Sequence, residues 1–121
     1  MKLLFIYNAD SGPLNALLDS VHKIVRPDTY DCKLCALTYG IVSEDALWKA
    51  YREASHHELV FLHRDEFQKQ YRSKWLPKYD FPVILEANAN GLELLLSAQE
   101  LNEIDSSEDL IERLNQLTDS R

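Results

Sequence analysis

The two cysteines of this chain are the residues best suited to covalent chemistry, and both lie in one motif, Cys32-Lys33-Leu34-Cys35. Two thiols at this spacing are typical of thiol–disulfide exchange, or of a site that binds a soft metal. Only the thiolate form attacks a disulfide, and a helix N-terminus or a nearby cation lowers the pKa of the cysteine beside it. In the redox interpretation, Cys32 is the attacking thiolate and Cys35 is the resolving thiol of a catalytic pair.

The residues around the motif give this interpretation mixed support. Asp28, Thr29 or Asp31 could cap a helix that begins near Cys32, and Lys33 supplies one positive charge. The carboxylate of Asp31, by contrast, would raise the pKa of the adjacent thiol. The redox interpretation also needs the first thiol at the start of a helix that follows a strand, whereas the first predicted strand and helix of this chain contain no cysteine.

Two other interpretations of the cysteines stay open. In the first, Cys32 and Cys35 form half of a zinc site, and His22, His56 or His57 supplies further ligands. The usual spacing of two zinc-binding histidines is absent, and adjacent residues of a regular element point in different directions. In the second, both cysteines are small apolar side chains that pack the surrounding segment onto the rest of the domain.

The composition is that of one ordinary globular domain. The chain has 121 residues, of which 45% are apolar and 27% charged, and its formal net charge is −7. The negative charge argues against nucleic-acid binding, and no stretch approaches the roughly 20 apolar residues of a membrane span. We therefore expect a cytoplasmic protein without a cofactor, in which the thiols are kept reduced and form no structural disulfide.

Hydrophobic periodicity and turn residues predict an alternation of strands and helices. The predicted elements are a strand at 3–8, a helix at 13–25, a helix from about 43 to 54, a strand at 58–63, a helix from about 65 to 75, strands at 81–87 and 92–97, and a last helix after Ser106. The turn at 88–91 contains Asn90-Gly91, a strong signal for a tight hairpin. The segment 26–57, which holds both cysteines, is an insertion between the first helix and the second strand.

This order of elements, with a proline at the start of the third strand, resembles the thioredoxin-like fold over the chain outside residues 26–57. The resemblance implies one α/β domain over residues 1–121, a β-α-β-α-β-β-α three-layer sandwich with a helical insertion. It also implies a cis peptide bond between Phe81 and Pro82, which the base rate for X–Pro bonds would not predict. Residues 7–12 and 32–40 are further similar to a group of small uncharacterised bacterial proteins.

Alignment with a thioredoxin places Ser11-Gly12-Pro13-Leu14 on the family's Cys-Gly-Pro-Cys motif. A serine hydroxyl does not ionise near neutral pH without a base, so the ordinary thioredoxin reaction is excluded at this position. The resemblance implies a groove for a peptide or protein thiol substrate, where backbone can pair with an extended peptide. The residues of this groove are Ser11, Gly12, Pro13 and Pro82.

These observations favour a thioredoxin-like protein that acts in thiol–disulfide exchange through its displaced cysteine motif. One alternative is a non-catalytic binding module that uses the same groove for a peptide or protein partner. The other is a protein that binds zinc or a soft metal through Cys32 and Cys35.

Overall fold

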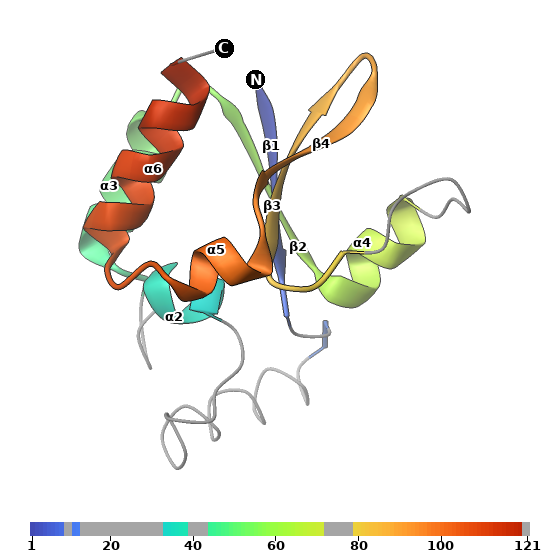
Figure 1. The fold of residues 1–121 in the computed structure, drawn as a ribbon, viewed down its shortest axis with the longest axis horizontal. Helices are drawn as coiled ribbons and strands as arrows, with labels where there is room; N and C mark the ends of the chain where they lie inside the picture. Colours follow the sequence, from blue (N-terminus) through green and yellow to red (C-terminus); the bar gives the residue numbers. More distant parts are fainter. Residues whose placement is uncertain (9–10, 13–32, 39–43, 72–78, 120–121) are drawn as a thin grey trace.

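The protein combines one mixed β-sheet with helices on both of its faces. The computed structural model describes residues 1–8, 11–12, 33–38, 44–71 and 79–119 (Figure 1). The elements in chain order are β1 (Lys2–Tyr7), α2 (Lys33–Thr38), α3 (Ala46–Ala54), β2 (Glu58–His63), α4 (Arg64–Gln70), β3 (Val83–Asn88), β4 (Gly91–Leu96), α5 (Ala98–Asn102) and α6 (Ser107–Asp119). Within these described ranges, no helix has the length and apolar character that crossing a membrane requires.

The central strands β1 and β3 determine the topology of the sheet. The strand order is β2-β1-β3-β4, in which β1 pairs parallel with β2 and antiparallel with β3, and β4 pairs antiparallel with β3. Tyr7 therefore lies opposite His63, and Ile6 lies opposite Val83. The carboxyl ends of β1 and β2 and the beginning of β3 share one end of the sheet, which is the lower end in Figure 1.

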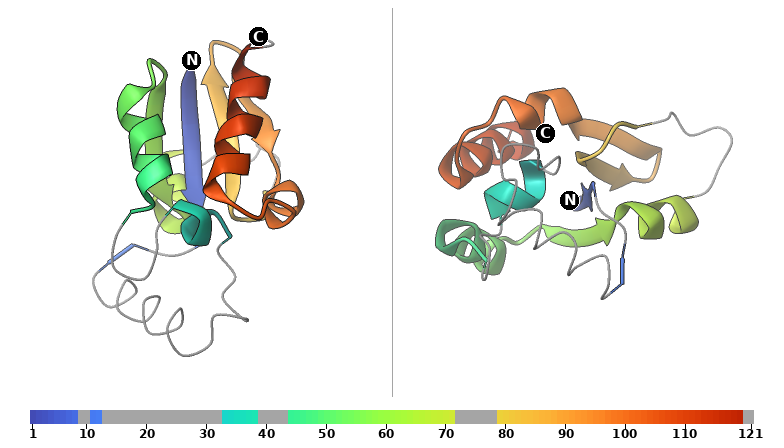
Figure 2. Two further views of the ribbon diagram at one scale, coloured as in Figure 1. Left: turned by 90° about the vertical axis from the view of Figure 1, so that its left-hand side faces the viewer. Right: turned by 90° about the horizontal axis from the view of Figure 1, so that it is seen from below.

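Alternate residues of β1 pack on opposite faces of the sheet. Leu3 and Phe5 belong to the larger apolar cluster, together with residues of α2, α3, α5 and α6. Leu4 and Ile6 belong to a smaller cluster, together with Phe67 of α4. Helices thus cover both faces (Figure 2), and the predicted α/β class is confirmed. Burial on both faces also explains why β1 is an uninterrupted apolar run instead of an alternating one.

The strand boundaries agree closely with the predicted ones. β2 has the predicted bounds, and the ends of the other strands differ by one or two residues. β3 begins after Pro82, which has no N–H to contribute to a ladder, and the peptide bond between Phe81 and Pro82 is cis, as predicted. In the hairpin turn only Gly91 has a positive φ, of 119°, while the Asn90 N–H donates to Asn88 Oδ1 at 2.8 Å.

The helices differ more from the prediction than the strands do. α3 begins at Ala46 and not near Ser43, because Asp45 is its N-cap and accepts a hydrogen bond from the Trp48 N–H at 3.1 Å. The short helix α5 was not predicted, whereas α2 lies where the redox interpretation considered a helix that begins near Cys32. The predicted helix at 13–25 lies outside the described residues. The last part, 72–75, of the helix predicted from about 65 to 75 lies outside them as well.

Trp48 is the largest fully buried side chain of the larger apolar cluster. Its ring contacts Phe5 edge-on, with a centroid distance of 5.4 Å, and Tyr51 at 5.3 Å. The preceding residue of α3, Leu47, is 56% exposed. Trp48 and Leu47 therefore lie on the buried and the exposed side of α3.

Trp48→Ala is expected to lower the free energy of unfolding by about 3–5 kcal/mol, because it removes a fully buried ring and leaves a cavity. Leu47→Ala is the matched control, and we expect it to change the free energy of unfolding by only about 0.5 kcal/mol or less. Urea-induced unfolding followed by circular dichroism measures both. Equal losses in the two variants would contradict this assignment of the faces of α3.

Candidate functional site

Polar side chains from two distant segments meet at the lower end of the sheet. The Ser11 hydroxyl donates to one carboxylate oxygen of Asp65 at 2.5 Å, and the Ser11 N–H donates to the other at 2.8 Å. The Arg64 guanidinium donates to Asn8 Oδ1 at 3.1 Å. Asn8 and Ser11 follow β1, whereas Arg64 and Asp65 follow β2, so these bonds fasten the segment after β1 to the start of α4.

The two bonds from Ser11 determine the charge state of Asp65. The Ser11 hydroxyl, followed by the Ser11 N–H, lowers the pKa of the Asp65 carboxyl below its ordinary value, because both donors favour the charged form. Asp65 is therefore ionised at neutral pH, and the serine hydroxyl is its donor. This arrangement gives Ser11 a positioning role between the segment after β1 and the start of α4.

A second polar pair, His63 and Glu66, lies beside the first. Glu66 Oε1 lies 2.8 Å from His63 Nδ1 and also accepts the backbone N–H of His63 at 2.8 Å. These bonds, the backbone one first, lower the pKa of Glu66, so its carboxylate is ionised and can only accept. The ring nitrogen Nδ1 is consequently the donor. The side chains of His63 and Glu66 are 44% and 42% exposed.

The cysteine motif is described in the structure only through its second member. Cys35 lies in the first turn of α2, is 8% exposed, and packs in the larger apolar cluster. Its sulfur is in a disulfide. This finding corrects the expectation that the cysteines of this chain are reduced and form no disulfide. Cys32 lies outside the described residues.

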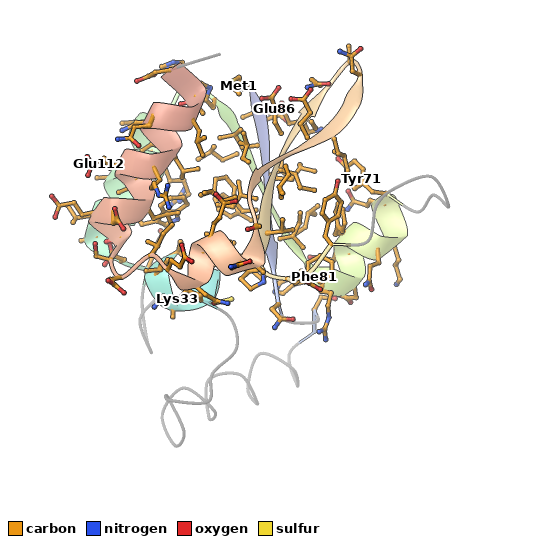
Figure 3. The ribbon with its side chains drawn as sticks, viewed as in Figure 1. Met1, Lys33, Tyr71, Phe81, Glu86 and Glu112 are labelled. Carbon is orange, nitrogen blue, oxygen red and sulfur yellow. The ribbon has the colours of Figure 1, made fainter. Side chains whose placement is uncertain are left out.

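Helix α2, which contains Cys35, lies at the same end of the sheet as the polar pairs. Lys33, the first residue of α2, and Phe81, which precedes β3, both lie toward the lower end, opposite Met1 (Figure 3). Lys33 is the first residue of α2 within the described ranges. The residues just after Cys32 are therefore helical, in the region where the sequence offered caps for a helix that begins near Cys32. Burial of the Cys35 sulfur fits a packing role and equally fits a resolving thiol.

The other predicted site residues lie at this end, with one outside the description. Gly12 is exposed and has a φ of 115°, a conformation that favours glycine. Pro82 is buried and immediately precedes Val83, which pairs with Ile6 of β1. Pro13 lies outside the described residues. Ser11 thus follows β1 and Pro82 precedes β3, so both lie beside adjacent strands at one end of the sheet.

The zinc alternative finds no assembled site in the part of the chain that the structure describes. There, no group of three or more histidine, cysteine, aspartate or glutamate side chains could hold a metal ion. His56 and His57 precede β2, so they lie at the opposite end of the sheet from its carboxyl end. His22 lies outside the described residues.

Sequence reasoning missed the role of residues 63–66. These residues lie where β2 ends and α4 begins. A signal was nevertheless present, because polar residues directly after two buried parallel strands meet at one end of a sheet.

Comparison with known proteins gave no match to a family model, a curated protein or a solved structure. The class of this protein therefore follows from its own features: it is a mixed α/β protein with a disulfide-bonded cysteine and a polar cluster at its strand ends.

Ser11→Ala is expected to raise the pKa of Asp65 toward the ordinary value of an aspartate, because the variant removes the hydroxyl donor. A carboxyl whose pKa is lowered in the folded state stabilises the fold above its unfolded-state pKa, and this contribution is lost as the pH falls through the folded-state value. The wild type should therefore exceed the variant in stability by more at pH 7 than at about pH 3.

The carboxyl carbon-13 shift of Asp65, recorded against pH, measures this pKa directly. Asp45 is the internal control, because its pKa is lowered by Ser107 and by the Trp48 N–H, neither of which the variant touches. We expect Asp45 to titrate identically in both proteins. An unchanged pKa of Asp65 in the variant would show that the bond from the Ser11 hydroxyl does not form in solution.

Proposed function

We propose that this protein is a thioredoxin-like thiol–disulfide exchange protein whose redox pair is Cys32 and Cys35. The thioredoxin-like assignment is supported by the order of elements, in which β3 and β4 form a hairpin followed by a helix, and by a proline directly before β3. The segment after β1, where a thioredoxin carries its cysteines, has Ser11 instead, and its hydroxyl donates to Asp65. The chemistry is therefore assigned to the displaced motif.

The observation that carries the proposal is the disulfide at Cys35. In the proposal its partner is Cys32, the other cysteine of the chain. Such a disulfide closes a loop so short that it constrains the unfolded chain little, by about 2 kcal/mol in the chain-entropy description. A reversible redox role accounts for it better than a structural one. Because Cys35 is only 8% exposed, it is the resolving sulfur, and Cys32 is the attacking one.

The substrate in this proposal is a peptide or protein thiol that lies along the lower end of the sheet. Backbone next to Pro82 can pair with an extended peptide, as an added strand would. The proposed contacts from Ser11 and Gly12 are with their backbone, since the Ser11 hydroxyl is used by Asp65. We place the reaction in the cytoplasm, where an exchangeable pair of thiols is regenerated by the reducing thiol pool.

A redox titration tests the proposal. Protein equilibrated with defined ratios of a reduced and an oxidised dithiol, then alkylated and weighed by mass spectrometry, is expected to change between zero and two alkylated cysteines within the range of biological potentials. In Cys35→Ser, the remaining thiol should be alkylated fast and should accumulate a mixed disulfide. In Cys32→Ser, the remaining thiol should be alkylated slowly, because Cys35 is buried.

Thiols that stay reduced at every potential tested would contradict the proposal. An undiminished reaction of Cys32→Ser with an oxidised dithiol would contradict it as well. Either result would favour the non-catalytic binding module, because the groove residues at the lower end of the sheet would then be the remaining functional feature. The pair of variants is its own control, since each removes one sulfur and leaves the other.

A further inference from the structure

We propose that this chain forms a reversible dimer in which β2 pairs antiparallel with β2 of a second copy, across a two-fold axis at Val60. The proposal goes beyond the proposed function and does not rest on it, because it concerns only the outer edge of the sheet. β2 is an edge strand in the order β2-β1-β3-β4, and within the described part of the chain it pairs on one side only.

The backbone of β2 faces alternately toward β1 and away from it. The Glu58 N–H donates to the Met1 carbonyl oxygen at 2.9 Å, so the backbone of Glu58 faces β1. Since the direction alternates along a parallel strand, Val60 also faces β1, whereas Leu59 and Phe61 face outward.

The N–H groups that flank this outward pair are bonded within the chain. The His57 N–H donates to Ser55 Oγ at 3.2 Å, and the His63 N–H donates to Glu66 Oε1 at 2.8 Å. The open edge between them is therefore short. It consists of two outward residues, each of which offers one N–H and one C=O.

A second copy of the same strand matches this open edge. With Val60 on the two-fold axis, Leu59 of each copy lies opposite Phe61 of the other, and each such pair exchanges two hydrogen bonds. The two pairs together use every outward N–H and C=O of the open edge. With Phe61 on the axis, Leu59 would meet His63, whose N–H is already bonded. With Leu59 on the axis, Phe61 would meet His57, for which the same holds.

The side chains along the open edge are apolar and half-buried. Leu59 and Phe61 lie at the margin of the larger apolar cluster, and Val60 lies at the margin of the smaller one. The pairing places Leu59 against Phe61 of the other copy on one face of the sheet, and the two Val60 side chains together on the other. It therefore covers apolar side chains on both faces.

The other edge strand, β4, has features that discourage such pairing. Its ladder with β3 has a register shift between Ile84 and Leu85, and the exposed Glu93 lies within the strand. Irregular ladders and charged side chains are means by which proteins prevent pairing at a sheet edge. β2, by contrast, pairs with β1 in unbroken register and has no charged residue between Glu58 and His63.

Charge and area determine the strength of this dimer. Each copy has a formal net charge of −7, and no ion pair within the open edge offsets the repulsion between two copies. A contact made by one edge strand lies below the roughly 1,200 Å² that a standard stable interface buries. The dimer is therefore reversible, forms at high protein concentration, and strengthens when salt screens the repulsion.

Sedimentation equilibrium over protein concentrations from about 1 µM to about 1 mM tests the proposal. The wild type is expected to change from monomer to dimer, with a dissociation constant that falls as salt is added. Val60→Lys puts two like charges together on the axis and should raise the dissociation constant by about 10-fold or more, although it reduces the net negative charge of each copy. Leu94→Lys is the matched control, because it introduces the same side chain at a 47% exposed position of β4, and it should dimerise like the wild type.

Amide hydrogen exchange locates the contact residue by residue. The N–H groups of Leu59 and Phe61 should become protected as the concentration rises, whereas that of Val60, which faces β1, should be protected at every concentration. Leu59→Pro removes one outward N–H and leaves the ladder with β1 intact, so it should weaken the dimer without loss of the fold. This variant keeps the proposal testable if Val60→Lys does not fold.

The outcomes are distinct from those of the redox titration. A chain that stays monomeric at every concentration overturns the proposal and leaves the open edge to an extended segment of another protein. A dimer that Leu94→Lys weakens, and that Val60→Lys and Leu59→Pro do not, overturns it as well. Loss of the dimer in both β2 variants, together with concentration-dependent protection of the two outward amides, supports it.

Discussion

Parallel pairing of β1 with β2 is the constraint on which the rest of this structure depends. Because both strands end at one end of the sheet, the residues that follow them meet, although 54 positions separate Ser11 from Asp65 in the chain. The pairing is held in register by β1, whose residues Leu3 to Ile6 are fully buried. A slip by one residue would exchange the two faces of β1, so the hydrophobic core also sets the geometry of the polar cluster.

The two faces of the sheet contribute different parts of the candidate site. The face under α2, α3, α5 and α6 carries Cys35 in an apolar surrounding that includes Trp48 and several leucines. The opposite face is covered by α4, whose first residues supply the carboxylates of Asp65 and Glu66. Cys35 therefore lies in an apolar environment, whereas the carboxylates of α4 lie in a more exposed one. His63 lies at the junction of β2 and α4, beside Tyr7 and Glu66.

Local patterns predicted the strands well and the site poorly, for physical reasons. The bounds of β2 follow from an apolar run with polar ends, and the buried leucines of α6 follow from their helical spacing. α5 has only five residues, too few for a periodic pattern to emerge. The bonds from Ser11 to Asp65 and from Arg64 to Asn8 join residues far apart in sequence, so only the pairing of the strands reveals them. The disulfide at Cys35 was not expected, because the compartment inferred from composition favours free thiols.

The burial of the Cys35 sulfur has a further consequence under oxidative stress. Peroxide converts an exposed thiolate first to a sulfenic acid and then, irreversibly, to sulfinic and sulfonic acids. A sulfur packed among apolar side chains and only 8% exposed is shielded from that sequence, and it is shielded equally from cross-linking to a second chain.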